Sequence, residues 1–271
     1  MNHHRKIMTV ASAVLLAAAC AQSQIITAWT FDNLPTGFTP NPAPSTGSGL
    51  ASTLGMNNSY PTPNAGGTTN ISDVLSDPGS SSGGPNAWRV RGGGNGDNGW
   101  SSLAPIGSQG AEFDASTVGY NNIQLTFDLH TTAQAEANLE VLYTIDGSAW
   151  LNATLSYSGS GATVMNNSSS PNTVMGSFIR FQNTAAPWYN GITASFGSAA
   201  NNDPNFGVRI VNASTGADDI NQSGTAYNNS SGNWRYDNIV ISSVPEPSAL
   251  ALAGLGFAGL LQGVRRNRRN S

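Results

Sequence analysis

The chain has little cysteine, histidine or lysine. Of its 271 residues, one is cysteine (Cys20), one is lysine (Lys6) and three are histidine. His130 is the only histidine beyond the first four residues. Beyond residue 23, disulfide bonds, thiol catalysis and zinc sites built from cysteine and histidine are therefore excluded.

Motifs that support catalysis are also lacking. No G-x-S-x-G elbow, the strand-to-helix turn that presents a serine nucleophile, supports a hydrolase. Paired carboxylates can hydrolyse glycosides, but no pattern selects a pair. We expect Asp128, Glu140 and Asp146 to be solvent-facing strand and turn residues, and His130 to lie on the surface. We predict that the chain is not an enzyme; a polysaccharide-active enzyme is the minor alternative.

Basic residues are scarce and gather at the two ends of the chain. Between these ends only five arginines face fifteen acidic residues, a net charge of about −10. These five are Arg89, Arg91, Arg180, Arg209 and Arg235. An acidic body without lysine offers no electrostatic footprint for phosphates, so nucleic acid is excluded as a partner.

Long apolar runs are confined to the ends. Residues 1–23 combine a basic start, an apolar stretch over 10–19 and small residues, "AAACAQSQ". This order is typical of a secretory signal peptide, and signal peptidase would cut near Gln22 or Gln24. In the alternative reading, Cys20 accepts a lipid.

The sequence between the ends alternates with the two-residue period of half-buried β-strands. Candidate strands cover 25–31, 87–92, 122–132, 138–146, 174–182, 206–212 and 234–242. Asp146-Gly147 is typical of a tight hairpin turn and should join antiparallel strands 138–145 and 149–157. Without helices to cover them, two sheets must cover each other. We predict an all-β, two-sheet antiparallel sandwich, jelly-roll-like, over 24–242.

Two stretches are too polar to form core elements. Residues 35–86 are rich in Pro, Gly, Ser, Thr and Asn, as in "PTGFTPNPAPSTGSG". Such a composition buries too little apolar surface to offset the entropy of ordering. We expect a long low-complexity loop there, and a second mobile loop at 91–100.

The C-terminal residues 243–271 have three parts. "VPEPS" (244–248) precedes an apolar run over 249–264, and four arginines follow: Arg265, Arg266, Arg268 and Arg269. As a helix the run would be about 24 Å long, short of the ~30 Å hydrocarbon core but able to insert marginally. The arginines would stay on the cytoplasmic side, leaving the body outside.

This arrangement resembles the PEP-CTERM sorting signal of Gram-negative bacteria. The resemblance implies processing by exosortase, a membrane transpeptidase, after an inner-membrane intermediate, and then release to the cell surface or extracellular matrix. It identifies Pro245, Glu246 and Pro247 with the recognition element. It also implies a link to exopolysaccharide and biofilm. The two prolines would hold the segment extended and accessible.

"WRYDNIVI" (234–241) resembles the closing strand of jelly-roll carbohydrate-binding modules, in which an aspartate often helps hold a structural calcium. That resemblance implies a Ca²⁺ site at Asp32 and Asp237. The alternative is that both acids cap strand ends.

Tryptophan is frequent for so polar a body. Aromatic faces stack on sugars, and we interpret Trp100, Trp188 and Tyr189 as candidate sugar-stacking residues in loops; the favoured alternative for each is packing within the body. Trp29, Trp150 and Trp234 lie in strand patterns and should pack in the core or against side chains of neighbouring strands. The sequence thus favours an exported surface or matrix protein with a structural or adhesive role. The alternative is a carbohydrate-binding module for the cell's own exopolysaccharide.

Overall fold

The computed structural model describes most of the body of the chain. The described residues are 23–32, 39–56, 58–61, 87–91, 100–167, 170–174, 176–185, 188–226, 228–229 and 232–244. The predicted signal peptide up to residue 22, the prolines and glutamate at 245–247, the apolar run and the terminal arginines lie outside them. Among the described residues, no helix is long and apolar enough to cross a membrane.

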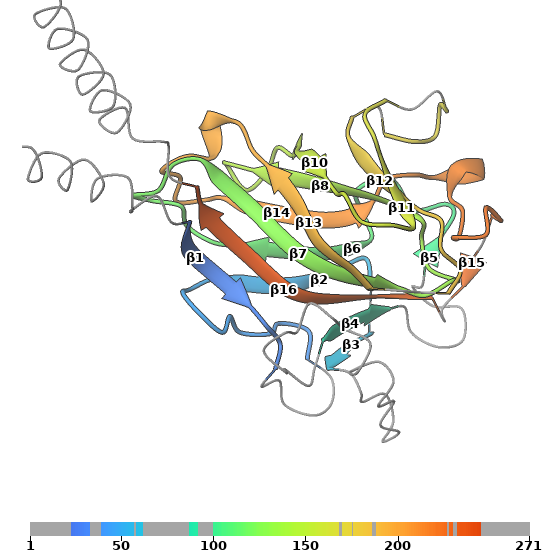
Figure 1. The fold of residues 1–271 in the computed structure, drawn as a ribbon, viewed down its shortest axis with the longest axis horizontal. Helices are drawn as coiled ribbons and strands as arrows, with labels where there is room; N and C mark the ends of the chain where they lie inside the picture. Colours follow the sequence, from blue (N-terminus) through green and yellow to red (C-terminus); the bar gives the residue numbers. More distant parts are fainter. Residues whose placement is uncertain are drawn as a thin grey trace, which may run out of the picture. The chain divides into compact units, whose positions relative to one another are not determined.

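Residues Ile25–Ser243 form one compact unit made of two facing antiparallel sheets, as predicted. Helix in the described residues is limited to two 3₁₀ turns, η1 (Ser198–Ala200) and η2 (Gly216–Asp218). Sheet A, in front in Figure 1, has the order β10-β13-β7-β16-β4-β3, and β1 also pairs with β16. Its strands are β1 (Gln24–Trp29), β3 (Asn58–Pro61), β4 (Trp88–Arg91), β7 (Ile123–Thr131), β10 (Thr154–Ser156), β13 (Trp188–Ser195) and β16 (Asn233–Ser243).

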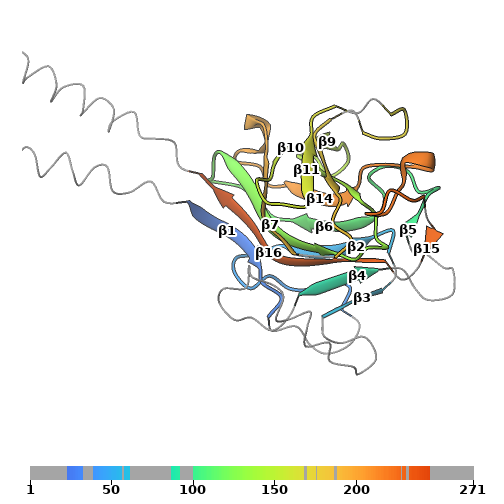
Figure 2. The same ribbon diagram turned by 45° about the vertical axis from the view of Figure 1, so that its right-hand side comes forward.

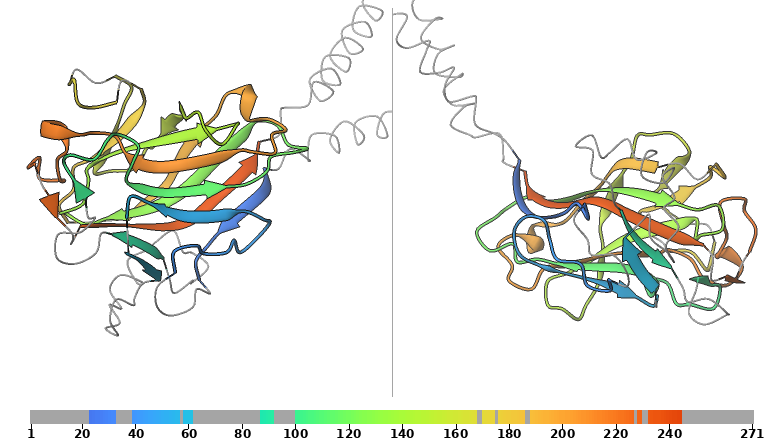
Figure 3. Two further views of the ribbon diagram at one scale, coloured as in Figure 1. Left: turned by 180° about the vertical axis from the view of Figure 1, so that it is seen from behind. Right: turned by 90° about the horizontal axis from the view of Figure 1, so that it is seen from below.

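Sheet B lies behind sheet A and faces the reader in the left view of Figure 3. Its order is β11-β12-β8-β14-β6-β2, with β9 added beside β8. Its strands are β2 (Leu50–Leu54), β6 (Gly110–Asp114), β8 (Asn138–Thr144), β9 (Leu151–Asn152), β11 (Ala162–Met165), β12 (Phe178–Phe181) and β14 (Gly207–Asn212). A separate two-stranded ladder joins β5 (Trp100–Ser101) to β15 (Asn228–Asn229).

Aromatic side chains fill the space between the sheets. The ring of Trp88 lies 6.0 Å from Phe113 and 5.9 Å from Tyr236, so that β4, β6 and β16 meet in one cluster. Trp29 packs edge-on against Phe113 at 5.3 Å. Both buried tryptophans also donate their indole N–H to backbone carbonyls, Trp88 to Thr39 and Trp29 to Pro42. The polar segment that begins at residue 39 is therefore anchored to the core.

Residues 35–86 are not one continuous loop, and this prediction is corrected. Within them, β2 pairs with β6 over five residues, and β3 pairs with β4 over four. The alternation in these strands is weak because each lies at the edge of its sheet, with one partner strand among the described residues.

The predicted hairpin at Asp146-Gly147 is confirmed in its pairing but not in its turn. Tyr143 pairs with Leu151, so the connection is longer than a two-residue turn. The second arm also divides: β9 stays in sheet B, whereas β10 crosses to pair with β13 in sheet A. Gly147 has φ 71°, the positive angle that made Asp-Gly a turn signal.

The two ends of the sandwich differ in what they carry. The beginning of β1 and the last residues of β16 lie at the same end in Figures 1 and 2. We call this the exit end; it also carries the 115–122 and 145–150 connections. We call the opposite end, with the 132–137 connection, the 213–222 segment and the first residues of β16, the distal end.

Candidate functional site

The first candidate site is the point where β16 leaves the sandwich. Ser243 is still paired with Ile123 of β7, and its hydroxyl donates to the carbonyl of Asn121 at 2.6 Å. Val244, the next residue, is already 38% exposed. The folded strand therefore reaches to within two residues of Pro245, the first residue of the predicted recognition element.

The second site is a buried polar cluster on the outer face of sheet A. β13 and β16, which flank β7, each carry a β-bulge. The positive φ angles of Gly191 (71°) and Asn238 (48°) mark these bulges. Between them, Asp128 accepts the Gly191 N–H at 2.6 Å and the Asn238 side-chain amide at 2.9 Å. Asp128 was expected to face solvent, but it is buried, and donors from both bulges bind it.

The sugar-stacking prediction is wrong for Trp100 and Tyr189, and Trp188 is also almost fully buried. Trp100 lies in β5, is 1% exposed and packs 4.5 Å from the ring of Trp234. Tyr189 is fully buried, with its ring 4.5 Å from Phe181. Neither ring offers a face to a ligand.

Trp188 and His130 form an edge-to-face pair on the outer face of sheet A. Their ring centroids lie 5.5 Å apart, and both side chains are buried. The surface position expected for His130 is therefore wrong: β13 and β16 pair with β7 on both sides of it.

The predicted calcium residues occupy different environments. Asp237 is buried on β16, opposite Asp128, and accepts the backbone N–H of Asn238. Asp32 follows β1 and is partly exposed. Among the described residues, no group of three or more His, Cys, Asp or Glu side chains could hold a metal ion. A calcium site at Asp32 and Asp237 stays a prediction.

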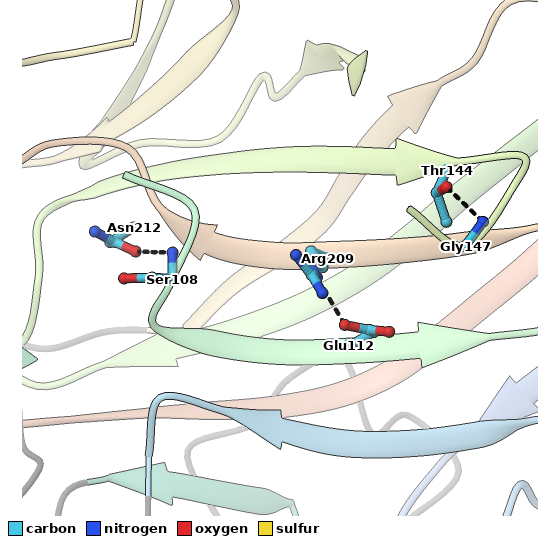
Figure 4. Close-up of polar contacts among 6 residues, drawn as sticks. All are labelled: Ser108, Glu112, Thr144, Gly147, Arg209 and Asn212. Atoms are coloured by element: carbon cyan, nitrogen blue, oxygen red, sulfur yellow. Dashed lines mark hydrogen bonds and ion pairs between the residues drawn. The ribbon is translucent and has the colours of Figure 1, made fainter. Parts of the chain in front are cut away.

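The outer face of sheet B carries an aromatic–arginine pair that sequence reasoning missed. Trp150 was expected to pack in the core or across strands; it is not in the core, and its half-buried ring lies over the Arg209 guanidinium, 3.7 Å from the ring centroid. Arg209 Nε also donates to Glu112 Oε2 at 2.6 Å across the β14–β6 pair (Figure 4). Period-two alternation assigns Trp150 to a face of its strand only if the whole segment 149–157 stays in one sheet. This segment crosses from one sheet to the other, so the alternation does not give the face on which Trp150 lies.

Two acids on this face have raised pKa values. Glu140 is 1% exposed, and among the described residues only the Asn152 amide donates a hydrogen bond to it, so burial raises its pKa to about 8. Burial, with repulsion from Glu112, raises the pKa of Asp114 to about 6, although Arg209 opposes the shift. The expectation that Glu140 faces water is wrong.

A pair of acidic residues lies at the distal end, where the sequence analysis predicted no site. Glu136 and Asp219 are both buried and are hydrogen-bonded through their side chains. Burial and the neighbouring Asp219 raise the pKa of Glu136 well above its ordinary value. The backbone carbonyl of Glu136 accepts the Trp234 indole N–H, which ties the pair to the core. Eighty-two residues separate the two acids, so only the fold unites them.

Residues 243–269 match the family model of the PEP-CTERM protein-sorting motif. This match confirms the resemblance drawn from the sequence and indicates an exported protein that exosortase processes. The matched segment begins at the last residue of β16. No match is found among the curated proteins.

Proposed function

We propose that the sandwich is the cargo of its sorting signal and has a structural or adhesive role in the extracellular matrix, together with the cell's exopolysaccharide. The observation that carries this proposal is the boundary at Ser243. The compact unit ends where the sorting motif begins, so a cut after Val244 leaves every described strand of the sandwich in place. Signal peptidase would remove the leader at the other terminus.

The roles of the acidic side chains support a non-catalytic body. Asp128 joins two bulges, Glu112 pairs with Arg209, and Asp146 accepts the backbone N–H groups of its own turn. Each of these carboxylates thus already has a structural task. A body whose carboxylates hold the fold together suits a protein that is displayed on the surface and does not catalyse a reaction.

Deleting the gene for this protein from its host tests the matrix role. We expect the deletion strain to form a biofilm with less retained matrix, and the wild-type gene to restore it. A variant with Pro245, Glu246 and Pro247 changed to alanine should not restore it, because the sandwich stays behind in the membrane. If the deletion strain retains as much matrix as the wild type, the protein has no role in the matrix. If the alanine variant restores the matrix, the role does not depend on the sorting motif.

The second candidate function is binding of exopolysaccharide, and Trp150 is the residue that favours it. Its ring is half-buried, it is stiffened by Arg209, and Glu112 lies beside it to accept hydrogen bonds from hydroxyl groups. Aromatic faces with a polar handle nearby are well suited to sugar rings.

A glycan array probed with the surface-released form tests this second function. Trp150→Ala should abolish any signal, whereas Trp188→Ala is the matched control, because Trp188 is almost fully buried against His130. Thermal unfolding of both variants separates lost binding from lost folding. Binding that survives Trp150→Ala in a folded protein rules out this platform.

A further inference from the structure

The distal end brings two buried carboxyl groups into contact. Glu136 lies just before β8, and Asp219 follows η2; the exposed fractions of the two residues are 0% and 2%. Two carboxylates in one dry site repel each other and lose their hydration. Something positive must therefore lie between them, either a shared proton or a cation.

One hydroxyl-bearing residue contacts this pair, and a second is its bridge partner. Ser214 Oγ donates to Glu136 Oε1 at 3.0 Å. Thr173 forms an antiparallel bridge with Ser214, and the flanking hydrogen bonds run from Val174 N to Ala213 O and from Thr215 N to Asn172 O. In this arrangement Thr173 and Ser214 form the closer, non-hydrogen-bonded kind of pair, with both side chains on the same face.

The Thr173 hydroxyl is the second, independent observation. Thr173 is 3% exposed, and its Oγ1 is buried without a hydrogen-bond partner among the described residues. A buried hydroxyl without a partner costs free energy unless something binds it. Its pairing with Ser214 directs it to the side of the sheet where Ser214 meets Glu136.

We propose that Glu136 and Asp219 bind a Ca²⁺ ion, with the hydroxyl oxygens of Ser214 and Thr173 completing the protein's side-chain contribution. Two carboxylates balance the charge of one divalent cation. All four groups are hard oxygen donors, the kind that Ca²⁺ prefers, and neither cysteine nor histidine is present to favour zinc. Backbone carbonyls and water supply the remaining oxygens of a six- to eight-coordinate shell.

The ion would join three segments that are far apart in the sequence. Glu136 belongs to the connection between the two sheets, Ser214 and Asp219 to the segment after β14, and Thr173 to the segment before β12. An exported protein without disulfides would gain a cross-link in this way. Extracellular calcium modules typically bind with dissociation constants of about 10⁻⁴ to 10⁻³ M.

Thermal unfolding of the full chain in detergent, with CaCl₂, MgCl₂ or EDTA, tests the site. At a Ca²⁺ concentration of about 100 times the dissociation constant, we expect Tm to rise by about 5–10 °C over EDTA. Mg²⁺ at the same concentration should give a smaller rise, because it demands stricter geometry and keeps its waters. Titration calorimetry should give one Ca²⁺ per chain. No calcium-dependent rise in Tm overturns the proposal.

Glu136→Gln distinguishes a cation from a shared proton. The glutamine amide can donate to Asp219 as a protonated Glu136 would, so the variant should fold and keep its Tm in EDTA. It should lose the calcium-dependent rise. Asp237→Asn is the matched control and should keep that rise. The opposite pattern, loss in Asp237→Asn and retention in Glu136→Gln, places the ion elsewhere and overturns the proposal.

Discussion

Glu140 is a buried acid whose surroundings do not compensate for its charge. It points to the outer face of sheet B, where Gly107 lies near its carboxyl group. The Asn152 amide donates to Oε2, but Oε1 has no hydrogen-bond partner among the described residues. Burial therefore raises the pKa of this carboxyl from 4.5 to about 8.

Replacing Glu140 with glutamine should stabilise the protein at high pH. Because the folded-state pKa lies above the unfolded value, the folded chain holds the proton more tightly, and stability falls as pH rises from about 4.5 to 8. The cost of ionisation is complete above pH 8 and amounts to a few kcal/mol, at about 1.4 kcal/mol per pKa unit. Glu140→Gln should raise Tm at pH 9 and leave it nearly unchanged at pH 5.

Glu112→Gln is the control for this effect. Glu112 lies on the same face but has Arg209 as an ion-pair partner, so neutralising it should not stabilise the protein at pH 9. Equal gains from both variants would show that the general negative charge of the body, and not burial of Glu140, is responsible.

At the scale of strands, the two bulges around β7 depend on one side chain. Asp128 joins β13 to β16 through its two oxygens, across the strand that lies between them. Without the carboxylate, the Gly191 N–H and the Asn238 amide lose their acceptor at positions where the ladder is already interrupted. The backbone geometry of the bulges alone does not replace these hydrogen bonds.

Asp128→Ala should lower the free energy of unfolding by about 2–5 kcal/mol, because hydrogen bonds to a charged group contribute about 1.5–3 kcal/mol each. Denaturant unfolding measures this change. Thr126→Ala, two residues earlier on the same face of β7, is the control and should cost far less. Similar losses in the two variants would mean that any change on this face disturbs the sheet.

The strands that the sequence predicts best are those with neighbours on both sides. β7, β8, β14 and β16 alternate clearly because one face of each is sealed against the other sheet and the ladder is complete. The edge strands β2 and β3 were missed, since an edge needs less apolar surface and can be built from Ser, Thr and Asn.

The candidate sites were predicted less well than the strands, for a physical reason. Period-two alternation assigns a residue to a face, but it does not say what covers that face. Asp128, His130 and Glu140 all lie on outer faces, yet all three are buried. Bulges and covering loops decide this, and they depend on long-range pairing. The sorting motif is the opposite case: its recognition depends on residue order within one segment, so it could be predicted from sequence.

For the whole molecule, the sorting motif governs where the sandwich ends up. We expect replacement of Pro245, Glu246 and Pro247 by alanine to leave the full-length chain in the membrane fraction, because exosortase loses its recognition element. Intact mass of the surface-released form and immunoblots of both fractions measure this. Alanine replacement of Val244 and Ser248 is the matched control and should permit release. Normal maturation of the variant without the Pro-Glu-Pro element would contradict the assignment.

The sandwich itself should also limit the rate of processing. A peptide enters an enzyme cleft in extended form and free of its own sheet, but β16 remains paired with β7 up to Ser243, two residues before Pro245. Either the last residues of β16 detach from β7 before processing, or the enzyme binds the motif directly beside the folded body. Detachment must break the Ser243–Asn121 hydrogen bond and the neighbouring ladder bonds, at about 1 kcal/mol each.

A six-residue Gly-Ser linker between Ser243 and Val244 should therefore speed maturation, because it adds about 13 Å of flexible reach. Pulse-chase labelling gives the half-time for loss of the full-length form. Ser243→Ala should speed it less, since it removes one hydrogen bond and leaves the spacing unchanged. The same linker between Gly147 and Ser148, an exposed turn at the exit end, is the control and should have no effect. If the linker at Ser243 leaves the half-time unchanged, access to the motif is not limited by β16, and the enzyme accepts the folded edge directly.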